Sequence, residues 1–126
     1  YPTSVFIELK YLKAAEKKLK KDKLDFVFSA KKYEHPIFRS FYLNSNKLIC
    51  PVFNKKKNEK KRTQDFKETF YDSGQFYIGS KKSWKLKKNI IYGNVGFIEL
   101  SRLGSSDIDN IKDWNNAKIL WKMLNK

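Results

Sequence analysis

The first half of the chain opens with a pattern typical of an amphipathic helix. From Glu8 to Lys21, Leu12, Ala15 and Leu19 recur at three- and four-residue intervals among lysines and acids. This spacing places the three apolar side chains on one face of a helix and the charged ones on the other. The sequence therefore predicts a helix with one buried stripe here.

A second helix is predicted over Ile111–Leu124, where apolar residues follow the same spacing. Asn110 stands at its N-cap position, with Asp113 three residues further on. In a capping box, the N-cap side chain accepts a hydrogen bond from a backbone N–H of the first turn, and the side chain three residues on accepts one from the N-cap backbone N–H. Asn110 and Asp113 form a pair close to this motif.

Short apolar and aromatic runs between the two helices predict strands. The run Leu24–Ala30 (LDFVFSA) has the character of a buried strand, Gln75–Ile78 lies between two glycines, and Val95–Leu100 forms a third candidate. Ser80 is placed to cap a short helix that extends through Trp84.

A hairpin is predicted in the middle of the chain. Ile37–Leu43 and Leu48–Phe53 are strand-like runs that flank the polar turn Asn44–Lys47. The charge run Asn54–Arg62 follows without apolar periodicity, and we interpret it as a surface loop.

These elements predict the fold class. Strands alternate with helices, a hairpin interrupts them, and a strand and a helix follow, which indicates a three-layer α/β domain carrying a β-rich arm. With 126 residues and no composition shift that marks a boundary, we expect one domain.

The balance of charges raises the question of an anionic partner. The formal net charge is +15, which attracts phosphates, nucleic acid or anionic sugars. Almost all of these cations are lysines, whereas base-specific readers use arginine for its bidentate fork. We therefore interpret the charge mainly as a solvated lysine surface.

The expected compartment is the cytoplasm. Cys50 is the single cysteine, which excludes a disulfide within the chain and fits a reducing environment. The sequence contains no run of about 18 apolar residues and no signal-peptide pattern, so we expect no membrane association.

The candidate chemistry begins with two acids, Asp107 and Asp109, which flank Ile108 just before the second helix. In extended backbone, residues two apart point to the same face, so both carboxylates can meet one cation. Magnesium takes one or two protein carboxylates and completes its shell with water and substrate phosphates. An alternative is purely structural, because a helix dipole favours acids ahead of its N-terminus.

Other motifs give this pair a context. In order along the chain they are Arg62-Thr63-Gln64-Asp65, then Asp72-Ser73-Gly74-Gln75-Phe76-Tyr77, then Asp107-Ile108-Asp109 followed by Asp113-Trp114. The chain resembles the acylneuraminate cytidylyltransferase family, and most of all the branch that makes CMP-pseudaminic acid. Members of that branch carry Arg-Ser-Gln-Asp, Asp-Ala-Gly-Gln-Phe-Tyr, and Asp-Ile-Asp before Asp-Trp, at similar spacing.

The resemblance implies a fold and a reaction. The fold is a nucleotide-diphospho-sugar transferase-like (Rossmann-like) α/β domain, here N-terminally incomplete, with residues 36–72 as dimerisation arm and basic loop. The reaction transfers CMP from CTP to the C2 hydroxyl of a nonulosonic acid such as pseudaminic acid, releasing pyrophosphate, with Mg²⁺ shielding the phosphates. The partners implied are CTP, the sugar acid and a second copy of the chain.

The resemblance also assigns site residues. Asp107 and Asp109 match the family's metal-binding pair. The substrate-binding candidates are Arg62, Gln64, Asp72, Gly74, Gln75 and Tyr77. The guanidinium of Arg62 suits a planar sugar carboxylate, Gln75 and Tyr77 share a strand face, and Gly74 suits a positive φ or a close backbone approach.

Two departures from the family limit what we expect of the chain by itself. Gly104-Ser105-Ser106 stands where the branch favours Arg-Val-Gln, and no glycine-rich loop that would cradle a triphosphate is present. We therefore expect a truncated enzyme that is inactive alone. Two alternatives are a lysine-rich nucleic-acid-binding module and a degenerate product that folds poorly.

Overall fold

The computed structural model describes residues 4–53, 60–101 and 108–124. The chain forms two compact units, one made of Tyr1–Lys31 with Asp72–Lys126 and the other of Lys32–Tyr71. None of the helices within the described residues is long and apolar enough to span a bilayer.

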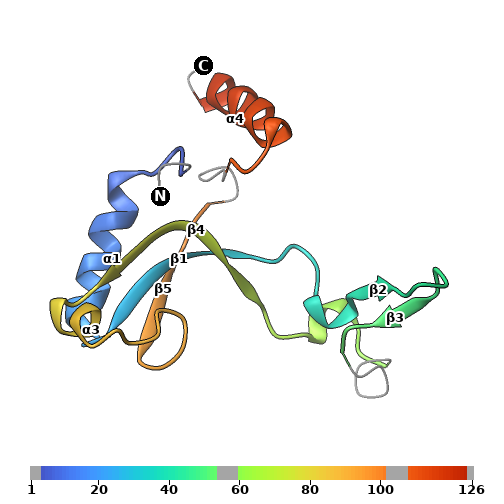
Figure 1. Cartoon of the computed structure of the whole chain (residues 1–126), viewed down its shortest axis with the longest axis horizontal. Helices are drawn as coiled ribbons and strands as arrows, with labels where there is room; N and C mark the ends of the chain where they lie inside the picture. Colours follow the sequence, from blue (N-terminus) through green and yellow to red (C-terminus); the bar gives the residue numbers. More distant parts are fainter. Residues whose placement is uncertain (1–3, 54–59, 102–107, 125–126) are drawn as a thin grey trace. The chain divides into compact units, whose positions relative to one another are not determined.

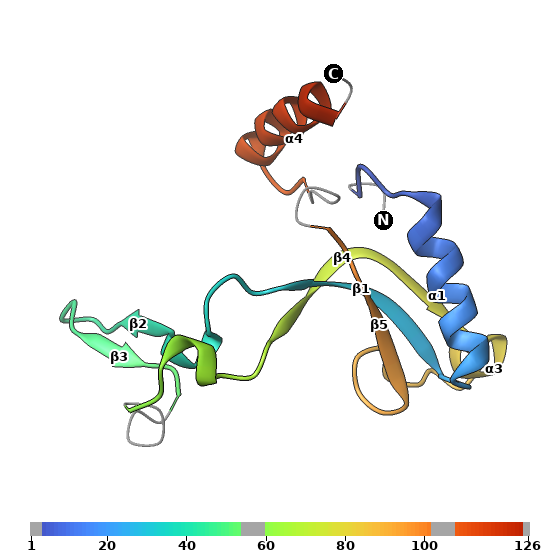
Figure 2. The ribbon, with the colours of Figure 1, turned by 180° about the vertical axis from the view of Figure 1, so that it is seen from behind.

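A three-stranded sheet organises the first unit. Its strands are β1 (Phe26–Lys32), β4 (Phe70–Gly79) and β5 (Val95–Glu99). Their order is β4-β1-β5, with β1 between the other two in both views (Figure 1; Figure 2). The three predicted strands are thus present.

The sheet is mixed. β5 runs parallel to β1 in continuous register. β4 runs antiparallel to β1, as two backbone hydrogen bonds show: Ser80 N donates to Asp25 O at 3.2 Å, and Tyr33 N donates to Thr69 O at 2.9 Å. The mixed sheet with its helices agrees with the α/β class that was predicted. The Rossmann-like and dimerisation-arm parts of that prediction stay predictions.

Helix α1 (Leu9–Lys21) covers one face of this sheet and confirms the first predicted helix. The core between the helix and the sheet consists of four buried residues: Ala15 of α1, together with Val27, Phe76 and Leu100. Further partly buried side chains pack around this core: Tyr11, Leu12, Leu19, Leu24, Ile78 and Ile98. The apolar stripe inferred from the spacing is therefore the surface that the helix buries.

The opposite face of the sheet carries aromatic side chains. Phe26 is fully buried and meets the edge of Trp84 with ring centroids 4.9 Å apart. Phe28 stacks on Tyr77 at 6.2 Å and lies 6.4 Å from Phe97. Aromatic pairs in such geometries contribute beyond their buried area, so this face has a packed aromatic cluster.

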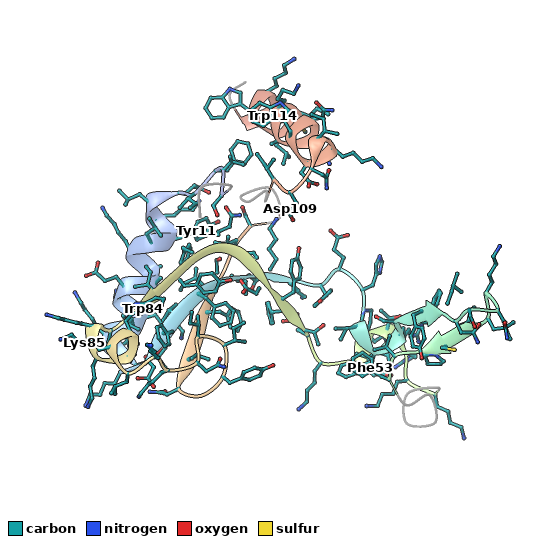
Figure 3. The ribbon with its side chains drawn as sticks, viewed as in Figure 1. Tyr11, Phe53, Trp84, Lys85, Asp109 and Trp114 are labelled. Atoms are coloured by element: carbon teal, nitrogen blue, oxygen red, sulfur yellow. The ribbon has the colours of Figure 1, made fainter. Side chains whose placement is uncertain are left out.

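Helix α3 (Lys81–Lys85) brings Trp84 to that face (Figure 3). Ser80 caps the helix as predicted, because its Oγ accepts a hydrogen bond from Ser83 N at 3.0 Å. The Ser83 hydroxyl donates to Asp25 Oδ1 at 2.6 Å, and Lys88 Nζ lies 2.8 Å from the same carboxylate. These polar contacts tie α3 to the start of β1.

Helix α4 (Ile111–Leu124) has the bounds that the spacing predicted. Asn110 Oδ1 accepts from Asp113 N at 3.2 Å, and Asp113 Oδ2 accepts from Asn110 N at 3.0 Å. The two side chains thus satisfy each other's backbone N–H groups, which confirms the predicted cap.

The second unit contains the hairpin of β2 (Phe41–Leu43) and β3 (Ile49–Pro51). Asn44 holds the turn, since its Oδ1 accepts from Leu48 N at 2.9 Å. The hairpin prediction is confirmed, but both of its strands were predicted too long, since β2 begins only at Phe41 and β3 ends at Pro51. Ile37–Arg39 forms a 3₁₀ turn directly after Pro36, whose ring fixes φ at −59° and favours a turn there.

One strand was predicted too short and two segments are not tested. β4 extends from Phe70, whereas the prediction began at Gln75 because a glycine precedes that residue. The basic run falls largely on residues 54–59, and Gly104, Ser105, Ser106 and Asp107 also lie outside the described residues. Predictions for those positions stay predictions.

Candidate functional site

A bulge in β4 is the most distinctive backbone feature among the predicted site residues. The two hydrogen bonds that bracket the paired strands join Tyr33 to Thr69 and Ser80 to Asp25. Between them the chain through β4 advances by 11 residues (from 69 to 80), whereas the chain through β1 advances by only 8 (from 25 to 33). β4 therefore accommodates extra residues within the ladder. Gly74 lies at this point with φ +66°, in the left-handed region that glycine adopts at little cost.

Ser29 of β1 takes up the hydrogen bonds that the bulge displaces. The side chain is fully buried, and its Oγ accepts from Gln75 N at 3.0 Å and from Phe76 N at 3.1 Å. The hydroxyl also makes a long bond, 3.5 Å, to Phe76 O. Sequence reasoning missed this residue, and the signal that was present is a hydroxyl in the middle of an apolar strand.

Asp72 and Tyr77 are joined across the bulge. Asp72 Oδ1 accepts from Gly74 N at 2.9 Å, and the Tyr77 hydroxyl donates to Asp72 Oδ2. Ser4 Oγ adds a bond to Gly74 O at 3.1 Å. Because its hydrogen is directed to Asp72, the Tyr77 hydroxyl can act towards a ligand only as a hydrogen-bond acceptor.

Gln75 follows the bulge and is 1% exposed. Its Nε2 lies 3.5 Å from Ser73 O. Phe76 and Ile78 join the core under α1, whereas Tyr77 stacks on Phe28 across the sheet, so Gln75 and Tyr77 share a face as predicted. Whether the Gln75 amide contacts a sugar stays a prediction.

Arg62 and Gln64 belong to the second unit. Arg62 directly precedes the 3₁₀ turn Thr63–Asp65, and Gln64 lies within it. Arg62 N donates to Asp65 Oδ2 at 2.9 Å, and Arg62 Nε lies 3.7 Å from the same oxygen. Both predicted residues are exposed. Their part in the site stays a prediction, because they lie in a different unit from the β4 residues.

Asp109 lies just before α4 (Figure 3) and is exposed. Its backbone N donates to Asp113 Oδ2 at 3.2 Å, so Asp113 is engaged in the helix cap. Asp107 is outside the described residues, and the predicted pairing of the two aspartates is therefore not tested. Within residues 4–53, 60–101 and 108–124, no three His, Cys, Asp or Glu side chains gather into a metal-binding group.

One cation near the bulge was not singled out from the sequence. Lys31 lies two residues beyond Ser29 on β1, and by strand alternation on the same face. Partial burial lowers the pKa of the Lys31 ammonium, because desolvation disfavours the charged form.

The chain is similar in sequence to several known proteins. No family model matches the chain. A Campylobacter jejuni protein named pseudaminic acid cytidylyltransferase is 36% identical over 123 residues, which is 98% of this chain and 52% of the relative. The chain is a homologue of the pseudaminic acid cytidylyltransferases. A second Campylobacter jejuni protein of the same name is 35% identical over 123 residues, and this chain spans about half the length of each of the two relatives.

A third relative extends the pattern to another genus. A Helicobacter pylori protein named pseudaminic acid cytidylyltransferase and UDP-2,4-diacetamido-2,4,6-trideoxy-beta-L-altropyranose hydrolase is 31% identical over 113 residues. That match covers 89% of this chain and 21% of the relative. The similarity to cytidylyltransferases that the motifs suggested thus extends over nearly the whole chain, and the nucleic-acid alternative is not favoured.

Proposed function

We propose that the protein carrying this chain transfers CMP from CTP to a nonulosonic acid, such as pseudaminic acid. The homology to pseudaminic acid cytidylyltransferases supports this reaction class. One observation links this reaction to particular residues: Asp72 binds both the Gly74 N–H and the Tyr77 hydroxyl. These residues lie in the segment that resembles the family's Asp-Ala-Gly-Gln-Phe-Tyr strand.

The proposed chemistry is a displacement at phosphorus. The C2 hydroxyl oxygen of the sugar acid forms a bond to the α-phosphorus of CTP, the bond from that phosphorus to the oxygen bridging to the β-phosphate breaks, and pyrophosphate leaves. The hydroxyl proton passes to solvent or to a nearby base. In this proposal Tyr77 accepts a hydrogen bond from the sugar, and Gln75, Arg62 and Gln64 contribute further polar contacts.

Asp107 and Asp109 are proposed to hold Mg²⁺. The described half of the pair fits, because the Asp109 carboxylate is exposed and hard divalent cations prefer carboxylate oxygens. Oδ2 of Asp113 already accepts two backbone N–H groups of the cap, so Asp113 is a weaker candidate for the metal. When bound, the metal ion supplies charge shielding for the phosphates.

The rest of the proposal concerns fold and assembly. We propose a Rossmann-like domain, which the parallel pairing of β1 with β5 and the packing of α1 on the sheet support. Six large apolar side chains of the hairpin unit are more than half exposed: Phe41, Tyr42, Leu43, Leu48, Ile49 and Val52. We propose that a second copy of the chain covers them in a homodimer.

The catalytic capacity of the 126 residues alone is a separate proposal. The two Campylobacter jejuni relatives are about twice as long as this chain, and this sequence has no glycine-rich phosphate loop. We propose that other residues supply most triphosphate contacts, so that these 126 residues alone produce no CMP-sugar. Turnover of CTP and pseudaminic acid by the purified 126-residue chain would refute this part.

The reaction is tested by following CMP-sugar formation chromatographically, using the protein that carries the chain with CTP, Mg²⁺ and pseudaminic acid. Tyr77→Phe should raise KM for the sugar acid about tenfold, the effect of losing one hydrogen bond of about 1.4 kcal/mol, with KM for CTP unchanged. Tyr92→Phe is the matched control, because Tyr92 is 77% exposed.

A metal-site variant completes this test. Asp109→Ala should abolish magnesium-dependent transfer, and undiminished activity would remove Asp109 from the proposed metal site. If the wild-type protein forms no CMP conjugate with pseudaminic, neuraminic or legionaminic acid, the proposed function is wrong.

A further inference from the structure

We infer that Ser29 is a positioning residue for the sugar side of the site, acting through the β4 bulge on Asp72 and Tyr77. This inference rests on the proposed function, because it assigns Ser29 a part in binding the sugar acid. Because Ser29 is fully buried, we propose that it acts through its neighbours and does not touch the ligand itself.

The hydroxyl of Ser29 uses its full hydrogen-bonding capacity on the backbone of the bulge. A serine hydroxyl has one donor and two acceptor lone pairs. Here the lone pairs serve Gln75 N and Phe76 N, and the hydrogen is directed to Phe76 O. Two consecutive N–H groups donate to one side-chain oxygen, in place of the backbone carbonyls that a regular ladder would supply. Without that oxygen, two buried donors would lose their partner, which is costly.

A chain of contacts leads from Ser29 to Tyr77. The N–H groups that Ser29 binds follow directly after Gly74, whose φ of +66° turns the backbone. In this conformation Gly74 N reaches Asp72 Oδ1 at 2.9 Å, and the second oxygen of Asp72 receives the Tyr77 hydroxyl. Relaxation of the bulge would therefore release the carboxylate that orients the Tyr77 phenol.

Ser83 provides a matched control within the same unit. It is 1% exposed, and its hydroxyl contacts Asp25 Oδ1 at 2.6 Å and Ser80 Oγ at 2.7 Å. Removing this hydroxyl disturbs buried hydrogen bonds to a comparable degree. The contacts concern α3 and the start of β1, however, and not the bulge.

The test compares Ser29→Ala with Ser83→Ala, and Ser29→Thr with Ser29→Val. Thr and Val have nearly the same volume, so that pair isolates the hydroxyl even if both are harder to accommodate than serine. Steady-state kinetics of the protein that carries the chain gives kcat and separate KM values for the sugar acid and CTP. The amide resonance of Gly74 in ¹H–¹⁵N spectra reports on the bulge independently of activity.

We expect Ser29→Ala and Ser29→Val to raise KM for the sugar acid about tenfold, the change equivalent to one lost hydrogen bond, and to shift the Gly74 resonance. KM for CTP should stay unchanged, Ser29→Thr should keep KM near the wild-type value, and Ser83→Ala should lower stability only. If Ser29→Ala does not fold, the Thr and Val variants decide.

Wild-type transfer together with an unchanged sugar KM in Ser29→Ala or Ser29→Val would overturn the positioning role and leave the proposed function intact. An equal rise of both KM values, or a rise in Ser83→Ala of the same size, would show that Ser29 is only structural. Absence of transfer by the wild type would overturn the proposed function, and this inference with it.

Discussion

Replacement of Gly79 by alanine should destabilise the first unit through a direct clash with its aromatic core. A Cβ at this position would lie 2.3 Å from Phe26 Cδ1, 2.4 Å from Phe26 Cε1 and 2.8 Å from Trp84 Nε1. Ordinary carbon contacts are about 3.5–4.0 Å, so the ring must move by more than about 1 Å. Phe26 is fully buried and packed against Trp84, which leaves the ring little room to yield.

The expected cost is about 1–3 kcal/mol, the usual range for forcing extra volume into a packed core. With an unfolding entropy of about 2.1 cal/mol/K per residue, a chain of 126 residues loses about 4 °C of Tm per kcal/mol. Gly79→Ala should therefore lower Tm by about 4–12 °C. Thermal unfolding followed by circular dichroism measures this directly.

Gly96 in β5 gives the matched control. A Cβ there would lie 2.7 Å from Leu24 Cδ1 and 3.0 Å from Lys18 Cε. Both atoms belong to flexible side chains that can move, so Gly96→Ala should change stability by less than about 1 kcal/mol. Equal losses in the two variants, or no loss in Gly79→Ala, would refute the idea that Trp84 locks Phe26 in place.

Three further predictions concern charge, assembly and capping. Hydrogen bonds from Lys88, and to a smaller extent from Ser83, lower the pKa of Asp25 in the folded protein. The ionised Asp25 carboxylate therefore stabilises the fold fully above the unfolded pKa of about 3.9, and this stabilisation is lost as pH falls through the lower folded pKa. Urea midpoints should thus fall less steeply with acid in Asp25→Asn than in the wild type, and parallel curves would contradict this. Leu43→Lys with Ile49→Lys, a cross-strand pair of the hairpin, should convert a dimer to a monomer by light scattering, and an unchanged mass would exclude the hairpin as the dimer contact. Asn110→Ala should cost about 1 kcal/mol and Asn110→Asp much less, so equal urea midpoints for the two variants would argue against the cap.

Local periodicity was sufficient to predict the helices and most strands. The helix Ile111–Leu124 was predicted with its cap because Asn110 and Asp113 act within one turn. Leu12, Ala15 and Leu19 mark the buried stripe of α1 directly. Signals that act between neighbours in sequence are visible without a structure.

The bulge could not be predicted, because it depends on residues far apart in the chain. Sequence reasoning interpreted Gly74 as a boundary and began the strand after it, whereas the structure continues the strand through it. The partner that makes this possible is Ser29, and its hydroxyl is only informative once β1 lies beside β4. Asp72, Gly74 and Tyr77 were predicted as site residues of one sequence motif, but their common position on β4 and their mutual hydrogen bonds were not foreseen.

We propose that this chain carries the sugar side of a cytidylyltransferase site around Asp72 and Tyr77. The most direct measurement is a calorimetric titration of the 126-residue chain with pseudaminic acid, for the wild type, Tyr77→Phe and Tyr92→Phe. We expect saturable binding that Tyr77→Phe weakens about tenfold and that Tyr92→Phe leaves unchanged. Absence of binding, or equal affinity in all three proteins, would contradict it.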